Sequence, residues 1–213
     1  MRPAVSHLAN ASISVEAAVA VDPAHTGTLR ALIGLAEAAE DWPKMVRGLT
    51  RLEAQGGSGS ERAAILLRLA EVSSGPLGDS VAAADYYAQA VENEPGNVVA
   101  LERLYEIRLE ENRWGEAASF LDRLIGLDGV GSPADRLRWE TARARCALAF
   151  GHLEEAITHL QAAHALDNSN REVLFALETV LWRQGRWSHA FKMIQTALVH
   201  HRDALSPEHL ADA

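Results

Sequence analysis

The chain has 213 residues, of which 48% are hydrophobic and 23% charged, a composition that excludes general disorder and supplies enough apolar side chains for a sizeable core. Its net charge is −9, from 20 Lys and Arg against 29 Asp and Glu. A protein that binds duplex nucleic acid needs the opposite balance to neutralise phosphates. The sequence therefore predicts no nucleic-acid partner.

The cysteine count and the apolar runs bear on the compartment. The single Cys146 cannot form an internal disulfide, which suits a reducing compartment. No run approaches the roughly 18 apolar residues of a membrane span, and residues 1–7 lack the apolar segment of a secretory signal. We expect a cytoplasmic protein without a membrane span.

The first expected element is a helix within residues 6–23. Its apolar residues Ala11, Val15 and Ala18 repeat at helical spacing, and Ala11 stands 34 residues before Met45 of a later helix. This correspondence indicates the second helix of a pair whose first helix is missing. Either the half repeat caps a stack of helices, or the chain was cut from a longer array, which we favour.

Helix pairs are expected to follow along the rest of the chain. Apolar residues at steps of three and four predict amphipathic helices, and short turns within each pair require its two helices to pack antiparallel. A short helix over residues 206–211 is expected to follow the last pair. The predicted repeats cover residues 26–55, 60–95, 97–128, 133–168 and 170–202.

The strongest regularity is a short pattern that recurs at the turn within the pairs. In three pairs a Gly or Asn stands two positions before a Trp or Leu, and a small residue follows that Trp or Leu. Ala83 and Ala117 are 34 residues apart, as are Ala156 and Ala190, whereas a longer loop separates Ala117 from Ala156 by 39. Self-similarity at this period indicates a stack of two-helix units. Because such a stack has no built-in reaction centre, its default function is to hold other molecules.

These residues resemble the tetratricopeptide repeat over residues 6–202, as one half repeat and five full ones. The resemblance implies an all-α fold, a right-handed α-solenoid of antiparallel helix pairs forming a single domain over residues 1–213. Three repeats depart from the pattern. Met45 replaces a small residue in the first, the second has an elongated Gly-Pro loop, and Glu140 and Arg143 of the fourth stand where apolar residues are common. The residues that carry the resemblance are Trp42, Trp114, Leu153 and Trp187, the small residues Ala83, Ala117, Ala156 and Ala190, and the closing Pro23 and Pro95.

In proteins with this repeat the first helix of each unit lines the concave surface, and the resemblance implies that ligands bind there. Phe175 and Trp182 are the most informative residues, because aromatic side chains in an exposed groove anchor partner segments. Arg138 and Arg145 could pair with acidic groups. The alternative is that both aromatic residues pack between helices and both arginines are solvated. The predicted groove residues are Arg103, Arg138, Arg145, Leu148, Phe175 and Trp182.

Few other groups in the chain offer chemistry. His152, Glu155 and His159 fall on one helical face that could hold a metal, but no further ligands accompany them and we expect solvated surface. Cys146 stands among alanines and is expected to be a small packing residue. The groove positions supply no Asn, so the Lys/Asn/Arg clamp with which some tetratricopeptide-repeat proteins bind carboxylates is not expected. We predict no metal, no cofactor and no enzymatic activity.

The sequence thus predicts a non-catalytic scaffold or adaptor that binds a partner protein or peptide on its concave face. Two alternatives stay open. One is a regulatory or substrate-docking segment of a larger enzyme, and the other is a protein that self-assembles into homo-oligomers through the open ends of its solenoid. The Ala- and Arg-rich composition gives the impression of a bacterial source.

Overall fold

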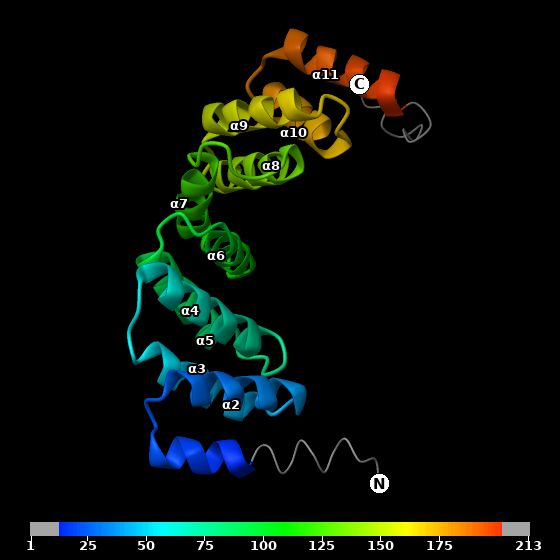
Figure 1. Cartoon of the computed structure of the whole chain (residues 1–213). Helices are drawn as coiled ribbons and strands as arrows, with labels where there is room; N and C mark the ends of the chain where they lie inside the picture. Colours follow the sequence, from blue (N-terminus) through cyan, green and yellow to red (C-terminus); the bar gives the residue numbers. More distant parts are fainter. Residues whose placement is uncertain (1–12, 202–213) are drawn as a thin grey trace. The chain divides into compact units, whose positions relative to one another are not determined.

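The computed structural model describes residues 13–201, and their regular secondary structure is entirely helical (Figure 1). This confirms the predicted all-α class. The predicted helix over 206–211 and the first part of the half repeat lie outside the described residues. After a helix over residues 13–21, the elements are α2 (Thr26–Ala38), α3 (Trp42–Glu53), α4 (Gly59–Ser74), α5 (Ser80–Asn93), α6 (Val98–Glu110), α7 (Trp114–Ile125), α8 (Pro133–Ala149), α9 (Leu153–Leu166), α10 (Arg171–Arg183) and α11 (Trp187–His201).

The turn within each helix pair contains one residue in the left-handed backbone region. This residue stands two positions before the second helix in all five pairs, which explains the recurring Gly or Asn of the sequence pattern, since these residues adopt positive φ most readily. Glu40 is the exception to that preference. The five residues and their φ angles are Glu40 (55°), Gly78 (66°), Asn112 (58°), Gly151 (74°) and Gly185 (70°).

Side-chain caps fix where several helices begin. The Asn97 side chain accepts a hydrogen bond of 3.0 Å from the backbone N–H of Ala100 and so caps the start of α6. Ser58 and Glu61 form a reciprocal capping box at the start of α4. With this box, α4 begins at Gly59, one residue before the predicted repeat over residues 60–95.

Two compact units make up the chain, Met1–Leu104 and Tyr105–Ala213, and each is described by itself. In the first unit α2 packs on α3, α3 on α4, and α4 on α5. Gly48 lies where α3 meets α2, and a Cβ atom there would stand 2.8 Å from Cγ1 of Ile33. Since Met45 replaces the usual small residue and is buried, Gly48 provides the close approach in this pair.

In the second unit α7 packs on α8, and the sequence of contacts continues through α9 and α10 to α11. The small residues Ala117, Ala156 and Ala190 are fully buried, as expected if they allow paired helices to approach closely. Cys146 is also fully buried, and this burial raises the pKa of its thiol. Its predicted packing role is thereby confirmed.

The two charged departures from the repeat pattern contact polar side chains of neighbouring helices in this unit. Arg143 on α8 pairs with Asp122 on α7 at 2.6 Å and also with Glu155 on α9. Glu140 on α8 lies 2.7 Å from Nδ1 of His159 on α9. Polar pairing therefore replaces apolar packing at these two positions. Of the helices in residues 13–201, none has both the length and the apolar character that crossing a membrane requires.

Candidate functional site

An open pocket of about 410 Å³ lies in the second unit along the first helices of three successive pairs. We call it the α8 pocket, because α8 contributes more than half of its lining. The C-terminal part of α6 and the start of α10 supply the rest. The lining side chains used below are Glu106 and Leu109 of α6, Leu137, Arg138, Thr141 and Arg145 of α8, and Glu172 of α10.

Charges of both signs line the α8 pocket. Arg138 and Arg145 are two helical turns apart on α8, so their Cα atoms are about 10 Å apart along the helix axis. Glu106 comes from one neighbouring first helix and Glu172 from the other. The pocket therefore presents a basic row on its central helix with a carboxylate from each neighbouring first helix.

The two arginines differ in their surroundings. The Arg138 guanidinium lies 3.3 Å from a carboxylate oxygen of Asp135 in the first turn of the same helix. A hydrogen bond from the Ser132 side chain is the main cause that holds the pKa of Asp135 below its ordinary value, and the charge of Arg138 adds to it. Arg145 is exposed and forms no hydrogen bond or ion pair with another residue in the described part of the chain. Arg145 is therefore the freer of the two to bind an anion.

Apolar and small side chains separate these charges. Leu109 and Leu137 are half-buried and line the pocket. The Thr141 hydroxyl donates a hydrogen bond of 2.8 Å to the backbone carbonyl of Leu137, so it is already engaged within the helix. The pocket can thus accept an apolar side chain next to a charged one.

The structure brings two of the six predicted groove residues, Arg138 and Arg145, into this pocket. Leu148 is half-buried and packs against the apolar core formed by α8 to α11. Arg103 belongs to the first unit, so it is described apart from the other five. The α8 pocket is lined by neither Phe175 nor Trp182.

Both predicted aromatic anchors make contacts within the helix pair that ends the described chain. The Phe175 ring is half-buried, with the Arg171 guanidinium 5.6 Å from its centroid. Trp182 is 46% exposed, and its ring meets that of Trp187 edge-on at a centroid distance of 4.5 Å. Trp187 itself is 54% exposed. It is therefore less buried than Trp42 and Trp114, which are half-buried at the same position of earlier pairs.

Several pocket residues were outside the sequence prediction. Leu137 belongs to α8 and is one position before Arg138, but it is not among the predicted groove residues. Asn170 lines the pocket while its side chain caps α10 through the backbone N–H of Val173 at 3.1 Å. The Asn at the start of a predicted helix was the available signal for that position.

His152, Glu155 and His159, the helical face considered above for a metal, contact other ionisable side chains. His152 lies 3.3 Å from Glu155, which also pairs with Arg143, and His159 pairs with Glu140. These contacts direct the side chains to separate partners. Within residues 13–201, no group of three His, Cys, Asp or Glu side chains is arranged to hold a metal ion.

Antiparallel helix pairs that follow one another along the chain, each with a left-handed turn residue, define a helical-repeat protein. No protein-family model matches the sequence, and no curated protein gives a significant match. Solved structures do resemble it. YrrB, a tetratricopeptide-repeat protein described as having an unusual peptide-binding site, is 13% identical with a TM-score of 0.65, covering 95% of this chain and all of YrrB.

Two further structures show the same likeness. MamA from Desulfovibrio magneticus RS-1 is 15% identical with a TM-score of 0.57, covering 85% of this chain and 97% of MamA. The N-terminal domain of stress-induced protein-1 from C. elegans is 13% identical with a TM-score of 0.50, covering 59% of this chain and 98% of that domain. The chain has the tetratricopeptide-repeat fold, which confirms the resemblance found in its sequence.

Proposed function

We propose that this protein is a non-catalytic scaffold for protein interactions and that the α8 pocket receives a peptide segment of its partner. The observation that carries the proposal is the pocket's lining, in which Arg138 and Arg145 share one face of a first helix beside half-buried leucines. A volume of about 410 Å³ suits a few side chains of a segment rather than a folded domain.

The charge pattern favours a particular kind of segment. Two arginines about 10 Å apart match acidic side chains three residues apart in a polyproline II segment, which rises about 3.1 Å per residue and returns to the same face every three residues. Glu106 and Glu172 would favour basic residues at the flanks of such a segment. We therefore expect an acidic centre with an apolar side chain beside it.

The same lining supports a role without catalysis. Its residues include no Ser, Cys or His, the side chains that most often serve as nucleophile or general base. The one hydroxyl on α8, that of Thr141, is bonded to its own helix. Binding is therefore the chemistry that the α8 pocket favours.

A peptide-display selection with the full chain as bait tests the proposal. We expect selected peptides with an acidic centre, and we expect the double variant R138E–R145E to bind a selected peptide at least about tenfold more weakly in fluorescence anisotropy. R30E–R183E makes the same charge change outside the pocket and should bind within about twofold of the wild type. Equal binding by R138E–R145E and wild type would show that the α8 pocket is not the peptide-binding site.

A second candidate function is self-assembly through the end of the stack. It is favoured by α11, which exposes Trp187, Phe191 and Val199 at 54%, 58% and 79%, since exposed apolar side chains at this density are typical of interaction sites. Light scattering across a concentration series tests it. A mass that rises with concentration and returns to that of a monomer in W187S–F191S supports assembly, whereas a monomer at every concentration excludes it.

A further inference from the structure

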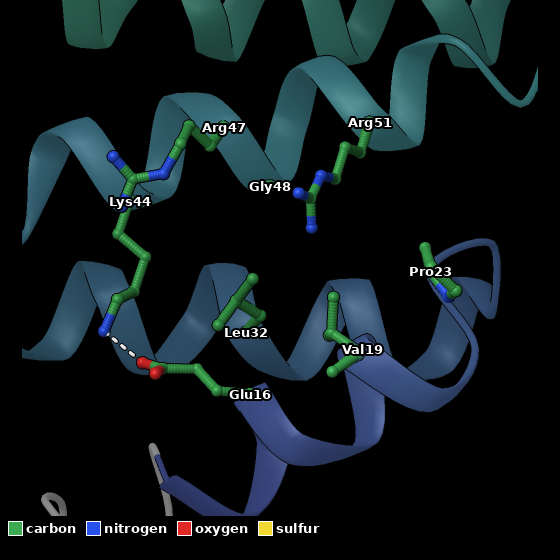
Figure 2. Close-up of a pocket in the computed structure, with 9 residues that line it drawn as sticks. Glu16, Val19, Pro23, Leu32, Lys44, Arg47, Gly48 and Arg51 are labelled. Atoms are coloured by element: carbon green, nitrogen blue, oxygen red, sulfur yellow. Dashed lines mark hydrogen bonds and ion pairs between the residues drawn. The ribbon is translucent and has the colours of Figure 1, made fainter.

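A second open pocket, of about 350 Å³, lies in the first unit between the helix of residues 13–21 and α3 (Figure 2). We call it the α3 pocket. The helix of residues 13–21 and α3 form its walls, and Leu32 of α2 also lines it, whereas first helices line the α8 pocket. Figure 2 shows Lys44 and Arg51 extending from α3 toward the helix of residues 13–21, with Leu32 and Val19 between them. The residues used below are Glu16, Val19, Leu32, Lys44, Arg47 and Arg51.

One of the three cations on α3 already has a partner within the pocket. The ammonium group of Lys44 forms an ion pair with Glu16, and a carboxylate oxygen of Asp41 lies 3.6 Å away. The hydrogen bond to Glu16 is the main cause that raises the pKa of Lys44. Lys44 therefore links α3 to the helix of residues 13–21 and is not the cation that awaits a ligand.

Arg47 and Arg51, unlike Lys44, have no side-chain partner among the described residues. Both are exposed, and neither forms a hydrogen bond or ion pair with any residue of the described chain. Elsewhere in this unit Arg62 pairs with Glu53 and Arg68 with Glu37. A chain with net charge −9 supplies carboxylates in excess, so two uncompensated arginines on one pocket wall stand out.

The spacing of these two arginines carries an energetic consequence. They are four residues apart, so their side chains lie on one face of α3, and like charges at that spacing repel each other. Figure 2 shows the two guanidinium groups apart, that of Arg47 toward Lys44 and that of Arg51 toward the helix of residues 13–21. Rotation of these exposed side chains would let one anion accept hydrogen bonds from both and relieve the repulsion. The wall beneath is apolar, with Val19 and Leu32 each only 6% exposed.

We propose that the α3 pocket is a second binding site, which takes an acidic peptide segment of a partner protein. Arg47 and Arg51 hold a carboxylate of that segment, and a neighbouring aliphatic side chain packs over Val19 and Leu32. This site is separate from the α8 pocket in its unit, its helices and its residues, so it does not depend on the function proposed above.

Backbone geometry favours a carboxylate over a phosphate. Many phosphate sites add free backbone N–H groups at the start of a helix to the charge of basic side chains. Here the cations stand in the middle of α3, where the N–H groups are bonded within the helix. The helix of residues 13–21 reaches the pocket with its C-terminal end near Pro23, where the helix dipole disfavours dense negative charge.

The test uses the full chain and a fluorescein-labelled peptide, Gly-Leu-Glu-Leu-Glu amide, with Gly-Leu-Gln-Leu-Gln amide as its neutral control. We expect saturable binding of the acidic peptide with a Kd below about 1 mM, and binding at least about tenfold weaker for the neutral peptide and for R47Q–R51Q. R30Q–R183Q, which removes the same charge elsewhere, should bind the acidic peptide as the wild type does. The series is repeated in an R138E–R145E background, so that binding of the acidic peptide by the α8 pocket does not mask the effect of R47Q–R51Q.

Each contrary result overturns the proposal. No saturation up to about 1 mM, no effect of R47Q–R51Q in the R138E–R145E background, or loss of binding only in R138E–R145E would each show that the α3 pocket is not the site. Displacement of the peptide by inorganic phosphate at equal concentration would show a simple anion site instead. Thermal melts of R47Q–R51Q check its fold, and two exposed arginines without partners should leave the melting temperature unchanged or slightly raised.

Discussion

The Arg143 side chain on α8 lies 2.6 Å from the carboxylate of Asp122 on α7, and it also pairs with Glu155 on α9. Only 11% of the Arg143 side chain is exposed, whereas its two partners are partly in water. One guanidinium group thus joins three consecutive helices. This is the reason that a charged residue is accommodated at a repeat position where apolar residues are common.

Removal of this link should weaken the second unit. We expect R143A to lower the free energy of unfolding by about 1–3 kcal/mol, because two charge-assisted hydrogen bonds and the packing of the arginine stem are lost. R68A breaks an exposed pair with Glu37 and should cost less than about 1 kcal/mol. Urea unfolding of both variants measures the difference. A smaller loss in R143A than in R68A would contradict the role assigned to Arg143.

The same link makes stability depend on pH. Burial alone would raise the pKa of Glu155, but the hydrogen bond and charge of Arg143, with a smaller effect of His152, lower it below its ordinary value of 4.5. A carboxyl group with a lowered pKa in the folded state contributes stability above the ordinary value, and this is lost as the pH falls through the folded pKa. E155Q should therefore be less stable than wild type near pH 7 and approach it as the pH falls below 4.5. Urea unfolding at a series of pH values checks this, and a gap that widens toward low pH would contradict it.

The close approach at Gly48 gives a second stability test. In G48A the new Cβ would meet Ile33, and we expect a loss of about 1–3 kcal/mol from overpacking. Gly34 on α2 is the matched control, since a Cβ there meets no atom within 4 Å. G34A should gain about 0.5–1 kcal/mol, because alanine has less conformational freedom to lose in a helix. The two alanine variants should thus shift the melting temperature in opposite directions.

The buried alanines of the repeat pattern predict a similar contrast. A117L and A190L place a large side chain at fully buried positions, and each should lose about 1–3 kcal/mol. A64L makes the same change at an exposed position of α4 and should stay within about 0.5 kcal/mol. Thermal melts compare the three. Wild-type stability in both A117L and A190L would show that the assigned helix pairing is wrong.

Much of the fold was predictable, because each local signal agreed with the repeat. The first residues of α3, α7, α9 and α11 are Trp42, Trp114, Leu153 and Trp187, which carry the resemblance in the sequence. Glu40 was not predictable as a left-handed turn residue, since only its place in the pair requires a conformation that its residue type disfavours. The repeat boundaries, and the idea of one solenoid over residues 1–213, stay predictions.

The sites were predictable only in part. Helical spacing placed Arg138 and Arg145 on one face, and the structure places both in the α8 pocket. Spacing within α8 could not show that Leu148 faces the core, because its neighbours there come from other helices. The α3 pocket was not predicted at all, since Glu16, Leu32 and Arg51 come from three helices and no pattern within one helix joins them.

Methyl NMR of the full chain, titrated with a peptide selected for binding, shows whether the α8 pocket receives that peptide. We expect shifts of the Leu109 and Leu137 methyl groups, which line the α8 pocket, and unchanged signals from Leu121 and Leu160, which are buried in the core. Shifts confined to methyl groups outside the pocket, with Leu109 and Leu137 unmoved, would contradict this expectation.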